Sequence, residues 1–226
     1  MGSAHHSRSG GQSPPYDGCS RIAVDFSIGG DIRFLSHQDM LRLFARAAVR
    51  ADLPVRHSHG FNPRPQISLP LPRPVGIASE AERVVFGFVR DVVASDIVVR
   101  LSRQMPAGIT LHGAEPLGPK ERCVPHRVHY RVALNGLDCT LLQAARDRII
   151  DSETLVYDRF VHNVSRYRRV DLRPYIESIE VTSDAVLFAL CVTQNGSAKP
   201  SEVCDLLGIG AENVNHLILR LSVEWQ

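Results

Sequence analysis

The chain has 226 residues, of which 44% are hydrophobic and 22% charged, a composition typical of folded globular proteins that excludes wholesale disorder. Its 26 lysines and arginines against 24 acidic residues give a net charge of +2, which neither requires nor excludes a polyanionic partner. No apolar run approaches the roughly 18 residues that a membrane helix needs, so we expect no membrane association. The five cysteines are scattered and have no C-x-x-C spacing, which argues against a disulfide framework and favours a reducing cytoplasm.

The first segments of the chain predict a leader, a strand and a helix. Residues 1–20 contain almost nothing apolar, and we expect a disordered leader there. Apolar and polar residues alternate over 21–28, which predicts a strand, and 32–35 is expected to continue extended. Ser36 followed three residues later by Asp39 is a capping-box pattern, and it predicts a helix that runs to about residue 50.

The rest of the chain predicts further strands and helices in the order β-α-β-β-α-β, then the same order again. Five prolines within 55–74 forbid a helix and predict an edge strand with a rigid loop. The pattern leaves the arginine-rich segment 159–173 unassigned. The other expected elements are a strand at 82–89, a helix at 96–105 capped by Ser95, strands at 109–114 and 128–134, a helix at 137–150 with the apolar stripe Leu141, Leu142, Ala145 and Ile149, extended segments at 153–160 and 176–182, a strand at 185–192, a helix at 201–207 and a strand at 214–224.

This order predicts an α+β fold made of two tandem ferredoxin-like (βαββαβ) modules. The first module is expected at 21–117 and the second at 127–226, with a glycine- and proline-containing linker between them.

Arginines are concentrated in two segments. Residues 33–73 hold seven arginines against two acids, a net charge of +5, and residues 159–173 hold five against one acid, a net charge of +4. Local excess matters for polyanion binding because counterion release depends on the charged face that is presented, although a solvated helix face is an equal alternative. The expected binding surface comprises Arg33, His37, Arg42, Arg46, Phe61, Asn62 and Arg64, and the second basic cluster comprises Arg166, Arg168, Arg169 and Arg173.

Three features within the first basic segment could act in catalysis, metal binding or ligand binding. His37 follows a strand and begins a helix, where it either bonds to nearby backbone or acts as a general base on a phosphate-linked substrate. His57 and His59 have a spacing that metals use, but no third ligand is evident, so we expect neither a metal nor another cofactor. The sequence GFNP at 60–63 predicts a rigid loop that presents Phe61.

Several motifs together resemble a known family. The strings DIRFLSHQD at 31–39 and GFNPRP at 60–65 are similar to the signature of the radical SAM-linked DUF2344 proteins. The resemblance covers about residues 21–224, through Arg42, Ser68, Pro72, Val75, Gly76, LRPYI at 172–176, Lys199, Pro200 and Gly208. Members of that family are encoded beside a B12-type radical SAM protein or fused to one, so the resemblance implies such a partner. It gives no catalytic role to any of these residues.

The resemblance and the basic segments together lead to two hypotheses. The C-x-x-x-C-x-x-C motif that ligates a radical SAM cluster is absent, so we expect a non-catalytic accessory protein that presents RNA or a ribosome-linked target to a separate radical SAM enzyme in the cytoplasm. The alternative is an RNA-binding or RNA-processing protein similar to tandem ferredoxin-like endoribonucleases, in which His37 would be catalytic. The glycine-rich loop of those enzymes has no good counterpart, because the glycines at 208 and 210 form too short a segment.

Overall fold

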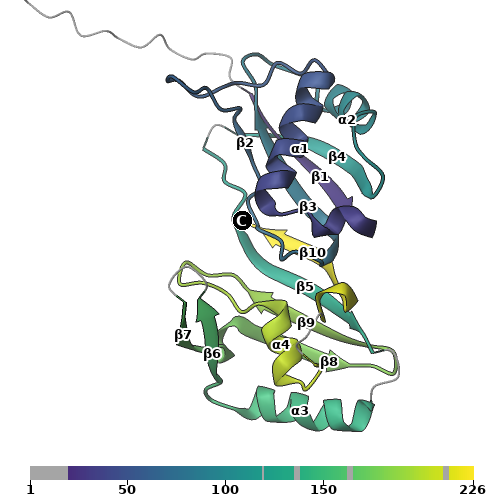
Figure 1. The fold of residues 1–226 in the computed structure, drawn as a ribbon, viewed down its shortest axis with the longest axis vertical. Coiled ribbons are helices and arrows are strands. Elements are labelled where there is room, and N and C mark those ends of the chain that lie inside the picture. The colour runs from purple at the N-terminus through teal and green to yellow at the C-terminus, as the bar shows by residue number, and fades with distance from the viewer. Residues whose placement is uncertain (1–19, 119, 135–137, 162–164, 211–213) are drawn as a thin grey trace, which may run out of the picture.

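The computed structural model describes residues 20–118, 120–134, 138–161, 165–210 and 214–226. All of the predicted leader except Ser20 lies outside these residues. The described chain is α+β, with four α-helices, one large and mostly antiparallel sheet, and a separate two-stranded hairpin (Figure 1).

The first half of the chain contributes the strands and helices at one end of the molecule. Strand β3 pairs antiparallel with β1 on one side and with the two-residue strand β2 on the other, and β4 pairs antiparallel with the free side of β1. The elements are β1 (Arg21–Ile28), α1 (His37–Arg50), β2 (Ile67–Ser68), β3 (Ala78–Gly87), α2 (Ala94–Ser102) and β4 (Ile109–Leu117).

The second half contributes the other end of the sheet and the hairpin. Strand β5 lies between β10 and β9, and β8 pairs with the outer side of β9, all antiparallel. The elements are β5 (Pro125–Ala133), α3 (Cys139–Asp151), β6 (Val156–Val161), β7 (Arg166–Asp171), β8 (Ile176–Val181), β9 (Ala185–Cys191), α4 (Pro200–Leu206) and β10 (Ile218–Trp225).

The two halves join through one short parallel contact between β3 and β10. Leu219 pairs with Ala78 and Arg220 with Ser79 at the start of β3, while β2 pairs with the far end of β3. The prolines after β2 lack the amide proton that a longer ladder needs, so β2 is short and leaves the start of β3 free for β10. The large sheet therefore has the strand order β4-β1-β3-β10-β5-β9-β8.

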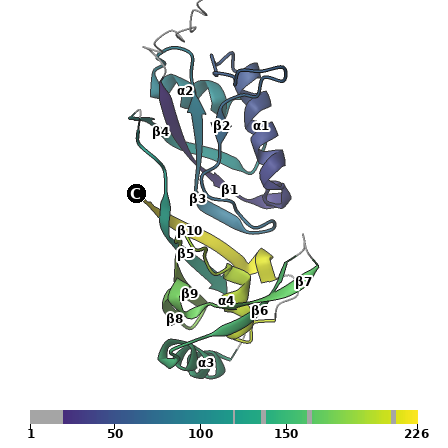
Figure 2. The same cartoon turned by 90° about the vertical axis from the view of Figure 1, so that its left-hand side faces the viewer.

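All four helices cover one face of this sheet, and Figure 2 shows α1, α4 and the hairpin β6–β7 on the same side. In the first half, Phe44 on α1 packs edge-on against Phe26 and Phe86 of the sheet. In the second half, Leu142 of α3 and Val203 of α4 pack in one core with inward-facing residues of β5 and β9. Alternation along the strands leaves the opposite face of the sheet, which we call the open face, to mostly polar residues.

The prediction for the first strand and helix agrees with the structure. β1 occupies 21–28 with a largely alternating burial pattern. Ser36 caps α1 by accepting a hydrogen bond from the amide of Asp39 at 3.2 Å. The buried side of α1 comprises Met40, Phe44, Ala47 and Ala48, which leaves the arginines of this helix on its other side.

Other boundaries and positions differ from the predictions. Residues 30–34 form a 3₁₀ turn rather than an extended segment, and 214–217 do the same before β10. Helix α2 begins at Ala94, so Ser95 lies inside its first turn and does not cap it. Leu141 is exposed, because Leu142, Ala145 and Ile149 already form the buried stripe and Leu141 lies about 100° around the helix from Leu142.

The extended segment expected at 153–160 contains most of β6, and the unassigned arginine-rich segment contains β7. The two strands form the hairpin β6–β7, which pairs with no other strand of the described chain. Among the described residues no helix is long and apolar enough to cross a bilayer.

Candidate functional site

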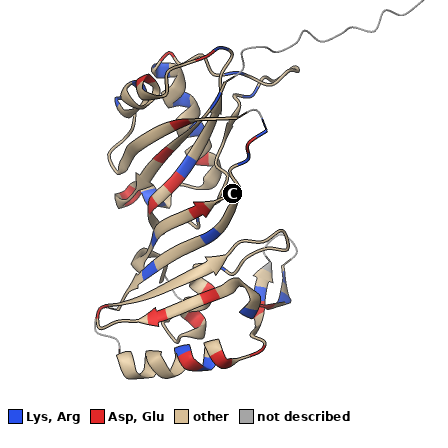
Figure 3. Ribbon diagram, turned by 180° about the vertical axis from the view of Figure 1, so that it is seen from behind, with Lys and Arg blue, Asp and Glu red and all other residues tan. Residues whose placement is uncertain are grey.

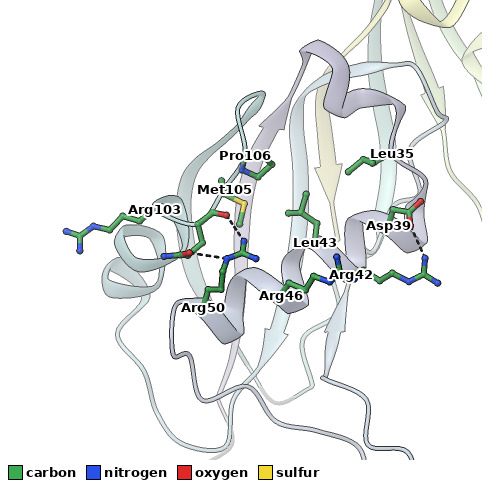
Figure 4. A pocket seen from close by; sticks show the side chains of 10 residues that line it. Leu35, Asp39, Arg42, Leu43, Arg46, Arg50, Arg103, Met105 and Pro106 are labelled. Atoms are coloured by element: carbon green, nitrogen blue, oxygen red, sulfur yellow. Dashed lines mark hydrogen bonds and ion pairs between the residues drawn. The ribbon is translucent and has the colours of Figure 1, made fainter.

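A groove runs along α1 on the helix-covered side of the first half. It encloses about 710 Å³ between α1 and the residues that follow α2. Its apolar lining comes from Leu35, Leu43, Met105 and Pro106, and its charged lining comes from four arginines and one aspartate (Figure 4). We call it the arginine groove, and its charged residues are Asp39, Arg42, Arg46, Arg50 and Arg103.

The helical repeat positions these arginines. Arg42, Arg46 and Arg50 follow one another at every fourth residue and therefore share one side of α1, as the row in Figure 4 shows. The opposite side of α1 is anchored in the core by Phe44, which forces the arginines outward. Arg103 projects from the end of α2, beyond Arg50. Four guanidinium groups thus share a groove with one carboxylate.

Local contacts hold two of these arginines and leave two available. Arg42 donates to Asp39 at 2.8 Å, and Arg50 donates to the side chain and the carbonyl of Gln104 at 3.1 and 3.0 Å. Within the described ranges, Arg46 and Arg103 form no ion pair. Hydrogen bonds from Ser36 and Arg42 hold the pKa of Asp39 below its usual value, so this carboxylate stays charged and offsets one arginine.

The GFNP loop lies beside the C-terminal end of α1. Phe61 is fully exposed, and the loop is held by an amide hydrogen bond from Arg64 to Ser58 at 3.0 Å. A mainly apolar hollow of about 450 Å³ separates this loop from α1 and is lined by Arg46, Val49, Arg50, His57 and Pro65, among others. Arg46 and Arg50 of α1 thus line the same hollow as His57 and Pro65, which flank the loop, whereas Phe61, Asn62 and Arg64 do not line it.

Arg33 and His37 lie at the other end of α1 and do not line the arginine groove. Since α1 is 14 residues long, the two ends are about 20 Å apart. The Arg33 guanidinium stacks on Phe34 at 5.1 Å, and His37 lines a hollow of only about 10 Å³ with Arg73 and Glu82. The structure therefore divides the single surface predicted from residues 31–42 and 60–65 into two places.

The second basic cluster is also divided. Arg166, Arg168 and Arg169 are exposed on β7, where Tyr167 packs edge-on against Phe160 at 5.2 Å. Arg173 does not belong with them. It donates to the carbonyls of Ile150, Ser152 and Ile176 at 3.2, 3.1 and 2.8 Å, so it fastens the end of α3 to β8.

On the open face of the sheet, basic side chains are paired with acidic ones. Figure 3, seen from this side, shows basic and acidic residues interspersed along the strands. Arg83 donates to both carboxylate oxygens of Asp25 at 2.7 and 2.9 Å, and these contacts together raise the pKa of Arg83. Arg127 donates to one carboxylate oxygen of Glu177 and to one of Glu224. Charges on this face are largely neutralised in pairs, unlike those of the arginine groove.

No three His, Cys, Asp or Glu side chains of the described residues lie close enough together to hold a metal ion. What the groove can do chemically is bind: its guanidinium groups suit phosphate or carboxylate oxygens, and its apolar lining suits the flat or aliphatic part of a ligand.

Comparison with family models matches residues 21–200 to one family, described as an uncharacterized protein conserved in bacteria (DUF2344). The chain belongs to the DUF2344 family. This DUF2344 match includes α1, the GFNP loop and the hairpin, and it ends before β10, the strand that joins the halves. No curated protein matches the chain.

Sequence reasoning about this DUF2344 chain missed part of the groove. Arg103 and Met105 come from a segment about 60 residues beyond α1, and nothing in the local pattern links the two. The one signal was the position of Arg103 at the end of a predicted helix. Arg173 was placed in the wrong group because its partners are backbone carbonyls, which leave no trace in a sequence.

Proposed function

We propose that this protein is a non-catalytic RNA-binding subunit that presents RNA to a separate B12-type radical SAM enzyme. The observation that carries the RNA part is the arginine groove, where Arg46 and Arg103 form no ion pair within the described ranges and border an apolar lining. Phosphates would lie on the guanidinium groups, and riboses or bases would lie on Leu43 and Met105.

The proposed partner rests on two further observations. DUF2344 proteins are linked to radical SAM proteins by the resemblance described above, and this chain has no C-x-x-x-C-x-x-C motif with which to hold a cluster itself. No disulfide joins the four described cysteines, and burial raises the pKa of the Cys204 thiol to about 12. Cysteines without disulfides also support our proposal that the protein acts in the cytoplasm.

We further propose that each half is one ferredoxin-like module, residues 21–117 and 127–226. Both halves support this interpretation through their strand order. β4-β1-β3 with β2 on the far side of β3, and β10-β5-β9-β8, each place the fourth strand of the module first, then its first, third and second. In the second module the hairpin β6–β7 is an insertion between α3 and β8.

Fluorescence anisotropy with a labelled 20-nucleotide single-stranded RNA tests RNA binding. The variant R46E/R103E is expected to bind about 100-fold more weakly or worse, since each reversal removes a charged contact worth about 1.5 kcal/mol or more. R122E/R148E, which reverses two exposed arginines outside the groove, is the matched control and is expected to stay within twofold of the wild type. Equal affinity of R46E/R103E and wild type would exclude the groove.

Co-purification tests the partner. The full chain and the radical SAM protein encoded nearest to it, expressed together, are expected to elute as one complex in size-exclusion chromatography. Separate elution at micromolar concentration contradicts the accessory role and leaves RNA binding to be judged by anisotropy alone.

The alternative, RNA cleavage by His37, is less well supported. His37 lies away from the arginine groove and contacts a hollow too small for a nucleotide. We expect labelled RNA to remain intact with both wild type and H37A. Cleavage by wild type and its loss in H37A would overturn the non-catalytic role.

A further inference from the structure

The two halves of the sheet meet in a cleft that the arginine groove does not reach. On the helix-covered side of the β3–β10 junction lie two adjoining hollows of about 510 and 570 Å³, which share Ser201 and Asn215 in their walls. We call them together the seam cleft. Each has the size of a small-molecule site, which is typically about 300–1,000 Å³.

The walls of the seam cleft combine an apolar surface with cationic groups. The apolar part of the first hollow includes Leu71, Val128, Tyr130, Leu190 and Val192. Its cationic part consists of Arg73, Lys199 and Arg220. Among the described residues, no carboxylate lines either hollow; Glu82 binds the Arg220 side chain at 2.7 Å, and Glu202 accepts from the backbone amide of Lys199 at 2.8 Å.

The cationic groups differ in how far the protein satisfies them. The Arg73 side chain is already bonded within the protein, because it donates to the carbonyls of Arg33 at 2.8 Å and Pro74 at 3.2 Å as well as to that of Ile77. Arg220 is only 1% exposed, and its Nη2 donates to the Pro72 carbonyl at 3.2 Å. Its Nε–H has no partner. Lys199 is exposed at the rim.

Unpartnered polar atoms gather at this seam. In the described part of the chain, three buried side-chain atoms lack a hydrogen-bond partner, namely Arg33 Nε, Asn215 Oδ1 and Arg220 Nε. Asn215 and Arg220 line the cleft, and Arg33 stacks on Phe34, which lines the second hollow. Native proteins rarely leave such atoms without a partner, so the two atoms in the cleft wall, Asn215 Oδ1 and Arg220 Nε, point to a bound species that supplies one. A guanidinium can only donate, so the partner of Arg220 Nε must carry an acceptor oxygen, whereas the partner of Asn215 Oδ1 must donate.

We infer that the seam cleft binds a small organic anion, with its phosphate or carboxylate group against Arg220 and Lys199 and its apolar body against Tyr130 and Leu190. An inorganic ion alone would leave most of the first hollow and its apolar wall empty. The Nε–H of Arg220, which has no partner, and the ammonium group of Lys199 can each donate to a phosphate or carboxylate oxygen. This inference does not depend on RNA binding, because the groove and the cleft share no lining residue.

Isothermal titration calorimetry with phenyl phosphate tests the inference on the full chain. Phenyl phosphate joins the anion to an apolar ring, whereas phenol and inorganic phosphate each supply one part alone. We expect phenyl phosphate to bind at least tenfold more tightly than either, and benzoate to distinguish carboxylate from phosphate preference. K199E, at an exposed position, is expected to weaken binding at least tenfold, and S201F is expected to abolish it by filling the wall shared by both hollows.

The controls separate this site from other sources of binding. S102F places the same ring on the exposed end of α2, and R46E/R103E alters only the groove, so both are expected to keep wild-type affinity for phenyl phosphate. R220K retains the charge but loses the fork of donors, and it is expected to weaken binding without loss of the folded circular dichroism spectrum. No heat of binding with wild type, or unchanged affinity in K199E and S201F, overturns the inference. RNA binding by S201F reports on the groove separately.

Discussion

The two faces of the large sheet handle charge in opposite ways. On the open face, Arg83 and Arg127 are each bound to two carboxylates, and the side chains neutralise one another. On the helix-covered face, the arginine groove gathers four arginines around Asp39. Exposed pairs contribute about 0–1 kcal/mol each, so the open face gains solubility and order more than stability. Unpaired guanidinium groups beside apolar surface stabilise nothing within the fold, which is why we assign them to a ligand.

The pair of Glu82 and Arg220 at the seam is a third arrangement, in which both charges are buried. We expect its disruption to have the largest effect on the free energy of unfolding. Burial alone would lower the pKa of Arg220, but the charge of Glu82 and the contact with Tyr130 raise it overall. E82Q keeps the shape and leaves the Arg220 charge unpaired, so we expect the free energy of unfolding to fall by about 3–5 kcal/mol in urea titrations. E224Q on the open face is the control, and we expect it to change the free energy of unfolding much less than E82Q does. Equal effects of the two substitutions would contradict the comparison.

Arg173 and Arg168 sharpen the comparison within a single predicted cluster. R173A removes the donor to three carbonyls around the end of α3, and we expect it to lower the free energy of unfolding by about 1–3 kcal/mol because those acceptors lose their partner. R168A, on the exposed side of β7, is expected to change it by less than about 0.5 kcal/mol. Thermal unfolding of both variants checks this. An R173A variant as stable as the wild type would contradict the structural role of Arg173.

The salt dependence of RNA binding tests whether the groove arginines contact phosphates. With two such contacts to a single strand, from Arg46 and Arg103, log K is expected to fall with log salt with a slope of about −1.4. R46A should reduce the steepness by about 0.7, whereas R131A, whose partner on the open face is Asp184, should leave it unchanged. Anisotropy titrations between 50 and 200 mM KCl give both slopes, and a slope unaltered by R46A argues against phosphate contact.

The smallest expected effect concerns pH on the open face. Hydrogen bonds with His129 and then Arg127 lower the pKa of Glu224 below its ordinary value. A lowered folded-state pKa stabilises the folded state above the unfolded-state pKa of about 4.3, and this stabilisation is lost as the pH falls through the folded-state pKa. The difference in unfolding free energy between wild type and E224Q should therefore be full at pH 7 and vanish in acid. A difference independent of pH would show that the pairing of Glu224 with His129 and Arg127 contributes nothing.

How far the sequence predicts this molecule depends on how local each signal is. Alternation gave β1, and the cap at Ser36 gave the start of α1, because both signals involve neighbouring residues. Strand β7 was left unassigned, since four of its six residues are exposed and no alternation of apolar and polar residues marks it. The β3–β10 pairing brings together residues about 140 positions apart, and only the three-dimensional fold reveals it.

For the candidate site, the sequence supplied residue types and the fold supplied their grouping. Arg42 and Arg46 were expected together from their spacing, and they share the groove. Arg33 and His37 were expected with them, but the length of α1 separates His37 from the GFNP loop. Arg220 lies in a strand and carries no motif, so its burial at the seam could not be foreseen.

The way β10 enters the sheet has a consequence for biosynthesis. β3 emerges from the ribosome long before β10, and its starting edge has no partner until then, since β2 covers only the far end. An unpaired strand edge is a template for intermolecular association. From the synthesis of β3 until that of β10, the growing chain thus carries an unpaired strand edge, and β10 then joins the two halves and ends that exposure.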